Sequence, residues 1–338
     1  MRFISMVAAA IALLGAVPAK SDGVADFYRG KSISLIIGFG EGGGYDLSAR
    51  LVAQYLPRFI PGNPSIVPRN MPGASSVRAV EYFHNVAPRD GTALGFFIST
   101  ITLDKATDRS LKYEPERFTW IGRVDSAVTF GVVWHDAPVQ SVDQAKRQKL
   151  ILAAIGPAGT AATLPWALNR LIGTQFAVVT GYDSSATMGL AMERGETQGI
   201  GSTSWDYLLT KPDWIAEKKI RIIYTLGLAR DARAPDAPTI LDLVESPRDK
   251  QVMTLLASTS TIGRALVAPP EVAADRAAAL RQAFAAMVKD PAFLADAKKR
   301  QLGVDPLPGA AIQGIVAEVM AMPSDIVETM KAVTQPMR

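Results

Sequence analysis

The sequence has no cysteine and only two histidines, His84 and His135, in 338 residues. The lack of cysteine excludes disulfides, cysteine-ligated zinc sites, iron–sulfur clusters and thiol nucleophiles. A histidine-based metal site or Ser-His-Asp triad would have to use one of two isolated histidines, and neither lies in a matching motif. We therefore expect no catalytic residue, no metal and no cofactor.

The chain also has little excess charge of either sign, with 36 basic and 32 acidic residues. No long Lys/Arg run supplies the concentrated field that binding to a phosphate backbone requires, so we expect no nucleic-acid partner. The 48% of hydrophobic residues is enough to build a core in each of about two domains of roughly 150 residues.

The N-terminus predicts export from the cytoplasm. Arg2 precedes an apolar run over residues 6–17, and Val17-Pro18-Ala19 offers a small-residue cleavage site. An uncleaved anchor is less favoured because the run is shorter than the roughly 20 residues of a membrane span. We expect residues 1–19 to be a signal peptide cleaved near Ala19, and the mature chain to be soluble.

Short apolar runs alternate with helical patterns after the N-terminus. Strands are expected at Ile33–Phe39 and Ala93–Ile98, and helices at Asp46–Leu56 and Ser75–Val86. This βαβ order, with nearly continuous apolar strands, indicates a parallel sheet covered by helices on both faces.

The pattern restarts in the middle of the chain. Further strands are expected at Gly131–Trp134, Leu150–Ile155, Phe176–Thr180 and Ile220–Leu226, with helices at Ala161–Ile172 and Ala186–Arg194. Two α/β units without a flexible tether predict two lobes with a cleft between them. Because open α/β sheets bind ligands at the carboxyl ends of their strands, the loops after the first strand of each unit are the places to search.

The first of these loops, Gly38 to Gly43, satisfies the GxGxxG pattern between a strand and a helix. A dinucleotide site also requires an acid about 20 residues later, and none occurs between Asp46 and Glu81. No lysine follows the glycines, which excludes a Walker loop. Backbone N–H groups and the following helix N-terminus remain suited to a small anion, and a plain turn is the alternative.

Asp46 has two interpretations, as a cap of the following helix or as a ligand contact. Two further loops also precede helices, at residues 70–76 and 156–160, and each is either an anion site or an ordinary capped turn. The second mirrors the first glycine loop in its placement, which favours a binding role.

In order along the chain, several motifs resemble the solute-binding receptors of tripartite tricarboxylate transporters, the Bug-type receptors. The motifs are Ile33 to Phe39, Gly42-Gly43-Gly44-Tyr45-Asp46, Asn70-Met71-Pro72-Gly73-Ala74, Pro88-Arg89-Asp90-Gly91-Thr92, Gly156 to Thr160, Gly195-Glu196 and Ala234 to Thr239. The resemblance covers nearly the whole mature chain.

This resemblance implies a periplasmic Venus-flytrap α/β fold of two lobes, each a mainly parallel sheet flanked by helices. Lobe boundaries are expected at 20–127 plus 230–338 and at 128–229. The receptor, a monomer and not an enzyme, would deliver a small organic acid to membrane permease subunits. The implied ligand-binding residues are Phe39, Gly42, Gly43, Gly44, Tyr45, Asp46, Ala74, Ser75, Gly156, Gly159, Thr160, Ala161, Tyr182 and Asp183.

Some residues depart from the family pattern. Gly38 and Gly40-Glu41 stand where many relatives have proline and small apolar residues, and Ser75-Ser76 replaces a glycine pair. These departures leave tricarboxylates, dicarboxylates, aromatic acids and amino acids open as solutes. An exported sensing module for a signalling partner is the alternative function, and an α/β oxidoreductase is the third.

Overall fold

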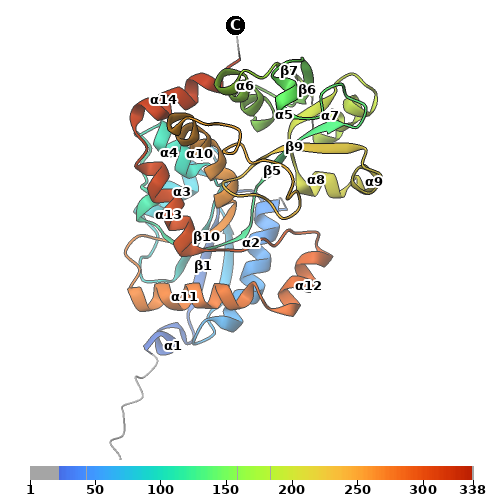
Figure 1. The fold of residues 1–338 in the computed structure, drawn as a ribbon. Helices are drawn as coiled ribbons and strands as arrows, with labels where there is room; N and C mark the ends of the chain where they lie inside the picture. The colour runs from blue at the N-terminus through green and yellow to red at the C-terminus, as the bar shows by residue number, and fades with distance from the viewer. Residues whose placement is uncertain (1–22, 43, 158, 183, 337–338) are drawn as a thin grey trace, which may run out of the picture.

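The structure is a computed structural model that describes residues 23–42, 44–157, 159–182 and 184–336. It consists of two lobes stacked one above the other, with the C-terminus on the upper lobe (Figure 1). The expected signal peptide and its cleavage near Ala19 lie outside the described residues.

Lobe 1 is built on a six-stranded sheet with the order β11-β4-β10-β3-β1-β2. Its strands are β1 (Ser32–Ile37), β2 (Ser65–Asn70), β3 (Ala93–Phe96), β4 (Thr119–Asp125), β10 (Arg264–Ala268) and β11 (Leu307–Pro308). The helices in these parts of the chain are α1 (Gly23–Tyr28), α2 (Gly44–Tyr55), α3 (Val77–Asn85), α4 (Ile101–Thr107), α11 (Ala274–Met287), α12 (Pro291–Lys299) and α13 (Gly309–Met320), with 3₁₀ turns at Leu56–Phe59 and Pro115–Arg117.

Lobe 2 is built on a five-stranded sheet with the order β7-β6-β8-β5-β9. Its strands are β5 (Thr129–Trp134), β6 (Leu150–Ala154), β7 (Phe176–Thr180), β8 (Gly199–Ser204) and β9 (Ile220–Leu226). Its helices are α5 (Val142–Ala145), α6 (Thr160–Ile172), α7 (Ser185–Glu193), α8 (Trp205–Leu209) and α9 (Pro212–Ala216).

Strand β1 shows why the first sheet is covered on both faces. Its side chains alternate in direction, so Ile33, Leu35 and Ile37 join one buried cluster and Ile36 joins another. The first cluster includes residues of α2 and α11, and the second includes residues of α3 and α13. Full burial of each such aliphatic side chain stabilises the fold by about 1.5–3 kcal/mol.

The chain crosses between the lobes more than once. It leaves lobe 1 at the end of β4 and enters lobe 2 at β5, and it returns after β9 through α10 (Pro247–Ile262) to β10. Helices α10 and α14 (Ser324–Val333) share a buried cluster with β5 and β6, and α14 contacts α6 of lobe 2 (Figure 1). The expected lobe boundaries stay a prediction.

Both sheets are mixed, with parallel pairs β1–β2, β1–β3, β6–β7 and β6–β8 beside antiparallel pairs of β10 and β5. Strands β5 and β10 each start at the gap between the lobes, so they run against the strands that end there. The two-lobed α/β class expected from the sequence is confirmed, and the antiparallel pairs follow from the crossovers.

Among the described residues, no single helix is long and apolar enough to cross a membrane; α13 and α14 pass that test only as a pair, with a bend of 90° between them.

Tyr224→Phe is expected to lower the free energy of unfolding by about 1–3 kcal/mol, because the buried Tyr224 hydroxyl donates to the Gly201 carbonyl at 2.6 Å. The loss leaves a buried acceptor without its donor. Tyr82→Phe is the matched control, since the Tyr82 hydroxyl has no hydrogen-bond partner among the residues that the structure describes. Urea unfolding measures the difference, and equal effects of both variants would contradict the assignment.

Candidate functional site

The carboxyl ends of β1, β2 and β3 in lobe 1, and of β6 and β8 in lobe 2, lie at the gap between the lobes. This follows from β4, which ends there before β5 begins, and from the antiparallel pairing of β3 and β4 with β10. The three loops expected to bind a ligand are therefore at the same gap.

The Asp46 carboxylate stabilises the first glycine loop by accepting hydrogen bonds from it and from neighbouring residues. Its side chain is 2% exposed and accepts hydrogen bonds from Gly42 N at 2.9 Å, Arg50 Nε at 2.9 Å and Asn70 Nδ2 at 2.8 Å. Asn70 Nδ2 also donates to Phe39 O at 2.9 Å. Asp46 is engaged with its own loop and helix and holds the loop backbone, and its expected ligand contact stays a prediction.

The pKa of Asp46 reflects these contacts. Burial alone would raise the pKa, but the hydrogen bonds from Arg50, Asn70 and Gly42 outweigh it and hold the pKa below its ordinary value of 3.8. Asp46 therefore stays ionised at neutral pH.

The aromatic residues of this loop pack on each other. The rings of Phe39 and Tyr45 stack with centroids 4.3 Å apart, and Tyr45 meets Phe96 edge-on at 6.0 Å. Gly44 begins α2, and its exposed backbone remains beside the gap. Gly43 lies outside the described residues.

The second loop contains three successive left-handed residues, Ala74, Ser75 and Ser76, with φ of 46°, 49° and 73°. This region costs an L-residue about 1–2 kcal/mol. Ala74 and Ser75 are exposed, whereas the buried Ser76 donates its hydroxyl to Gly38 O at 3.1 Å. The turn is thus tied to the first glycine loop.

In lobe 2, Gly159 is the N-cap of α6 and its carbonyl accepts from Ala162 N and Thr163 N. Thr160 donates to Ser202 Oγ at 3.1 Å, and Ser202 donates to Thr129 Oγ1 at 2.6 Å. This hydroxyl chain joins the start of α6 to the start of β5. Gly156 is half-buried and Ala161 is buried in the same segment.

Tyr182, the remaining lobe 2 candidate, packs against the cluster that contains Met188 and Met192. Burial, followed by the nearby Glu196 carboxylate, raises the pKa of Tyr182. Its neighbour Asp183 lies outside the described residues.

A cavity of about 120 Å³ lies between the lobes, and its lining differs from the expected glycine loops. It is lined by Asp125, Ser126, Ala127, Val128, Thr129, Ser204, Trp205, Asp206, Arg233 and Arg264. Larger cavities of about 590 and 630 Å³ adjoin it and share Trp205 and Arg233.

Arg264 connects this cavity to the first glycine loop. Its guanidinium lies 5.8 Å from the centroid of the Tyr45 ring, and a Cβ placed on Gly44 would be 3.3 Å from Arg264 Nη2. Arg264 Nη1 donates to Asp125 Oδ2 at 2.8 Å, and the two side chains are 20% and 7% exposed. A guanidinium at the N-terminus of a helix is suited to a carboxylate.

Asp125 has an unusual pKa because of this environment. Burial raises the pKa of Asp125 to about 6, Arg264 opposes the rise, and the carboxylate of Asp206 adds to it. Asp125, the partner of Arg264, therefore changes its charge near neutral pH.

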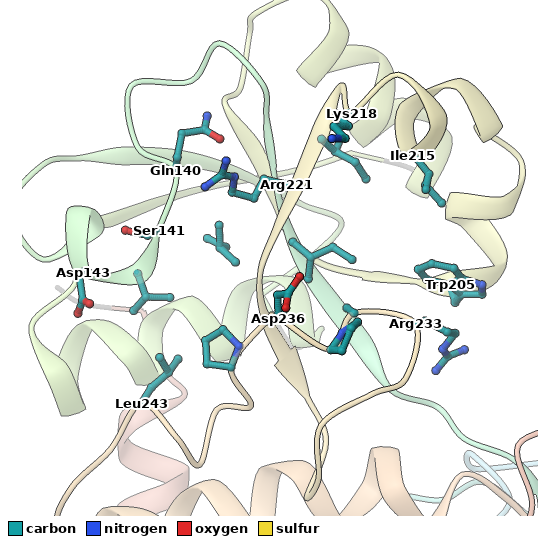
Figure 2. Close-up of a pocket in the computed structure, with 18 residues that line it drawn as sticks. Gln140, Ser141, Asp143, Trp205, Ile215, Lys218, Arg221, Arg233, Asp236 and Leu243 are labelled. Atoms are coloured by element: carbon teal, nitrogen blue, oxygen red, sulfur yellow. The ribbon is translucent and has the colours of Figure 1, made fainter.

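Another cavity, of about 680 Å³, lies on lobe 2 between edge strand β9 and residues 233–238 (Figure 2). Arg221 and Asp236 line its middle, and Trp205 and Arg233 lie toward one end in the view. None of the expected binding residues lines it. Trp205 and Arg233 connect it with the gap between the lobes.

The charged residues of the inter-lobe cavity, Asp125, Asp206, Arg233 and Arg264, are absent from the sequence-based set. The sequence signal that could have found such residues is a single charged residue at the end of an apolar strand. Asp125 is the last residue of β4, and Arg264 is the first residue of β10. Among the described residues, no group of three or more Asp, Glu or His could hold a metal ion.

No family model matches the chain. A UPF0065 protein in the gbd 5′ region of Cupriavidus necator is 27% identical over 251 residues, covering 70% of this chain and 72% of that protein. The ligand-free TctC solute-binding protein from Polaromonas superposes with a TM-score of 0.71 at 18% identity, over 89% of this chain and 99% of the other. The chain has the fold of the TctC solute-binding proteins.

Two further superpositions involve proteins of Rhodopseudomonas palustris with bound acids. MatC with malate gives a TM-score of 0.54 at 18% identity, over 88% of this chain and 99% of that one. A protein from R. palustris with adipate gives 0.53 at 19% identity, over 89% and 97%. The resemblance and the fold class expected from the sequence are confirmed.

Asp46→Asn is expected to lower the free energy of unfolding at neutral pH by about 1–3 kcal/mol, because the hydrogen bonds to a charged acceptor weaken. The Asp46 pKa is lowered by folding, so its contribution is present above the ordinary pKa of 3.8 and is lost as the pH falls through the lower folded value. Urea unfolding over a pH series measures this. A difference from wild type that persists in full at the acid end would contradict it.

Arg264→Gln is expected to raise the pKa of Asp125 above about 6, because the cation that opposes protonation is removed. In the wild-type protein, folding raises the Asp125 pKa. Its contribution to stability is therefore complete below the ordinary pKa of 3.8 and is lost as the pH rises through about 6. Carboxyl-carbon NMR titration measures the pKa directly. Arg221→Gln, on the exposed edge of lobe 2, is the matched control, and an unchanged pKa in Arg264→Gln would refute the pairing.

Proposed function

We propose that the chain is a periplasmic receptor that captures a small carboxylate-bearing solute between its lobes and delivers it to a tripartite tricarboxylate-type membrane transporter. The observation that carries the proposal is the placement of the Arg264 guanidinium, beside Gly44 of the glycine loop and in the wall of the inter-lobe cavity. A solute carboxylate there meets a fixed cation from one lobe and hydroxyls from the other.

Both lobes offer polar groups of the required kind. On lobe 1, the Asp46 hydrogen bonds preorganise the loop that carries Gly42 and Gly44. On lobe 2, Thr129 lines the cavity and continues the hydroxyl chain to Thr160 at the start of α6. The proposed ligand-binding residues of the glycine loops would complete the site when the lobes approach each other.

The superpositions support a two-lobed binding protein. The chain matches the ligand-free Polaromonas structure at 0.71 and the malate- and adipate-bound structures at 0.54 and 0.53, although the sequence identities are similar. One of these neighbours is a solute-binding protein and two hold a bound acid, which supports a receptor rather than an enzyme.

Neither histidine supports catalysis at this cavity. His84 packs on Phe118 in lobe 1 with ring centroids 5.8 Å apart, and His135 follows β5, where its N–H donates to Lys219 O. In this proposal the receptor acts as a monomer, and its partners are the permease subunits.

A melting-temperature screen of mono-, di- and tricarboxylates and aromatic acids tests the proposal. A ligand at about a hundred times its Kd stabilises the folded state by roughly 2.7 kcal/mol. Native mass spectrometry of freshly purified protein would show a retained acid. Melting shifts with neutral sugars alone would reject a carboxylate solute.

Gly44→Val is expected to weaken binding of the acid found in that screen by about 10- to 100-fold, because the new side chain displaces the Arg264 guanidinium. Gly44 lies outside the left-handed region, so the substitution should preserve the fold. Gly40→Val is the matched control, since a Cβ there meets nothing within 4 Å. Calorimetric titration measures both variants, and unchanged affinity in Gly44→Val would place the carboxylate elsewhere.

A further inference from the structure

The cavity of about 630 Å³ lies between α8 of the upper lobe and α12 of the lower lobe (Figure 1). Its apolar lining consists of Trp205 and Leu209 from lobe 2, and of Leu294, Ala297, Leu302 and Val304 from lobe 1. The other lining residues are Asp206, Thr210, Arg233, Lys298, Gln301 and Gly303. This volume is within the roughly 300–1,000 Å³ of small-molecule sites, whereas the 120 Å³ cavity beside Arg264 is below that range.

Two exposed leucines from different lobes line this cavity. Leu209 of α8 is 60% exposed, more than any other leucine among the described residues, and Leu294 of α12 is 41% exposed. Single exposed apolar side chains are common on protein surfaces. Two that come from different lobes and line one cavity are instead placed so that one apolar group between them can cover both.

The lobes do not use these leucines for their own cores. Leu208, which precedes Leu209, is buried in lobe 2, and Phe293, which precedes Leu294, is buried in lobe 1. Consecutive residues of a helix point about 100° apart, so each helix packs one residue into its lobe and presents the next to the cavity. The two leucines are therefore available to a ligand.

The cavity adjoins the candidate site for the carboxylate. Trp205, Asp206 and Arg233 line both this cavity and the smaller one that Arg264 also lines. Asp206 Oδ2 lies 3.8 Å from Arg264 Nη2, so the two cavities meet near the guanidinium. A solute whose carboxylate lies beside the first glycine loop can extend the rest of its body along the walls of the larger cavity.

The other adjoining cavity, of about 590 Å³, is lined by more charged residues. Arg123, Arg230, Asp231 and Asp305 line it but do not line the 630 Å³ cavity, and Arg123 pairs with Asp305 at 2.9 Å. An apolar body that covered these groups would remove them from water at a cost in free energy. The cavity between α8 and α12 is therefore the better place for the apolar part of a solute.

We propose that the cavity between α8 and α12 binds the apolar body of the solute, which is an acid with an alkyl chain or an aromatic ring rather than a hydroxyl-rich acid. This inference rests on the proposed receptor function and narrows its solute class. Leu209 from lobe 2 and Leu294 from lobe 1 contact the body from opposite sides. Affinity then rises about fourfold with each methylene that leaves water.

Acids that differ in the hydroxyl groups of their bodies test the solute class by calorimetric titration. Hexanoate is matched with gluconate, adipate with galactarate, and benzoate with gallate. In each pair that shows binding, the apolar acid should bind at least about 10-fold more tightly, because its body leaves water without losing hydrogen bonds. Butyrate and octanoate measure the gain per methylene, and 1-hexanol tests the need for the carboxylate.

Leu209→Gln and Leu294→Gln test the two walls. Both positions are exposed and glutamine favours helices, so the fold should persist. Each variant should weaken binding of the preferred apolar acid by about 10-fold and reduce its preference over the hydroxylated partner, because an amide covered by an apolar body loses its water. Leu190→Gln on α7 is the matched control and should behave as wild type, since Leu190 is 42% exposed and lines none of the three inter-lobe cavities.

The outcomes separate this inference from the function on which it rests. If a hydroxylated acid binds as tightly as its apolar partner or more tightly, the solute class is wrong while the carboxylate receptor stands. If both leucine variants weaken every acid by the same factor, the leucines contact each other rather than the solute, and the inference is overturned. If 1-hexanol binds as tightly as hexanoate, the carboxylate receptor is rejected while the apolar cavity stands. If no acid binds, both proposals are overturned.

Discussion

A buried ion pair between Asp125 and Arg264 lies where the chain passes from one lobe to the other. Asp125 ends β4 just before the crossover to lobe 2, and Arg264 begins β10 just after the return. Removing one partner of such a pair would leave an uncompensated buried charge, a loss worth about 3–5 kcal/mol in other proteins. The pair thus fixes the two crossing segments to each other and directs one end of a guanidinium into the gap.

The surrounding backbone is shaped to accommodate that pair. A Cβ on Gly303 would lie 2.5 Å from Asp125 Oδ2, so the absence of a side chain there leaves room for the carboxylate. Nearby, Asp46 holds one loop from beneath and Ser76 ties the strained second turn to it. The lobe 1 side of the gap is therefore a surface that its own hydrogen bonds hold in place.

The sequence predicted local features more closely than distant ones. The strands Phe176–Thr180 and Ile220–Leu226 occur with the expected bounds, because short β-branched apolar runs fit a pleated, half-buried surface. The first strand ends at Ile37 rather than Phe39, because the glycines release the chain into the loop. The antiparallel pairs depend on how the crossovers return, which no local pattern encodes.

The candidate site residues also divide into those that a local pattern predicts and those that depend on distant contacts. Its glycine loops are continuous in sequence and could be recognised, although the ligand contacts of those residues stay predictions. Asp125 and Arg264 are 139 residues apart, so nothing local to either one signals that they meet. A sequence-only interpretation of Asp46 also left two roles open, because the Asn70 contact that decides its orientation comes from a neighbouring strand.

The closeness of Gly44 to Arg264 links the evolutionary fates of two distant positions. A side chain at 44 would occupy space beside the guanidinium, and a shorter residue at 264 would leave that space empty. A lineage that changes either position alone passes through a protein with a displaced or missing cation. We therefore expect the two positions to be replaced as a pair during evolution. In that order of events, Arg264 is replaced first and Gly44 is then replaced by a larger residue.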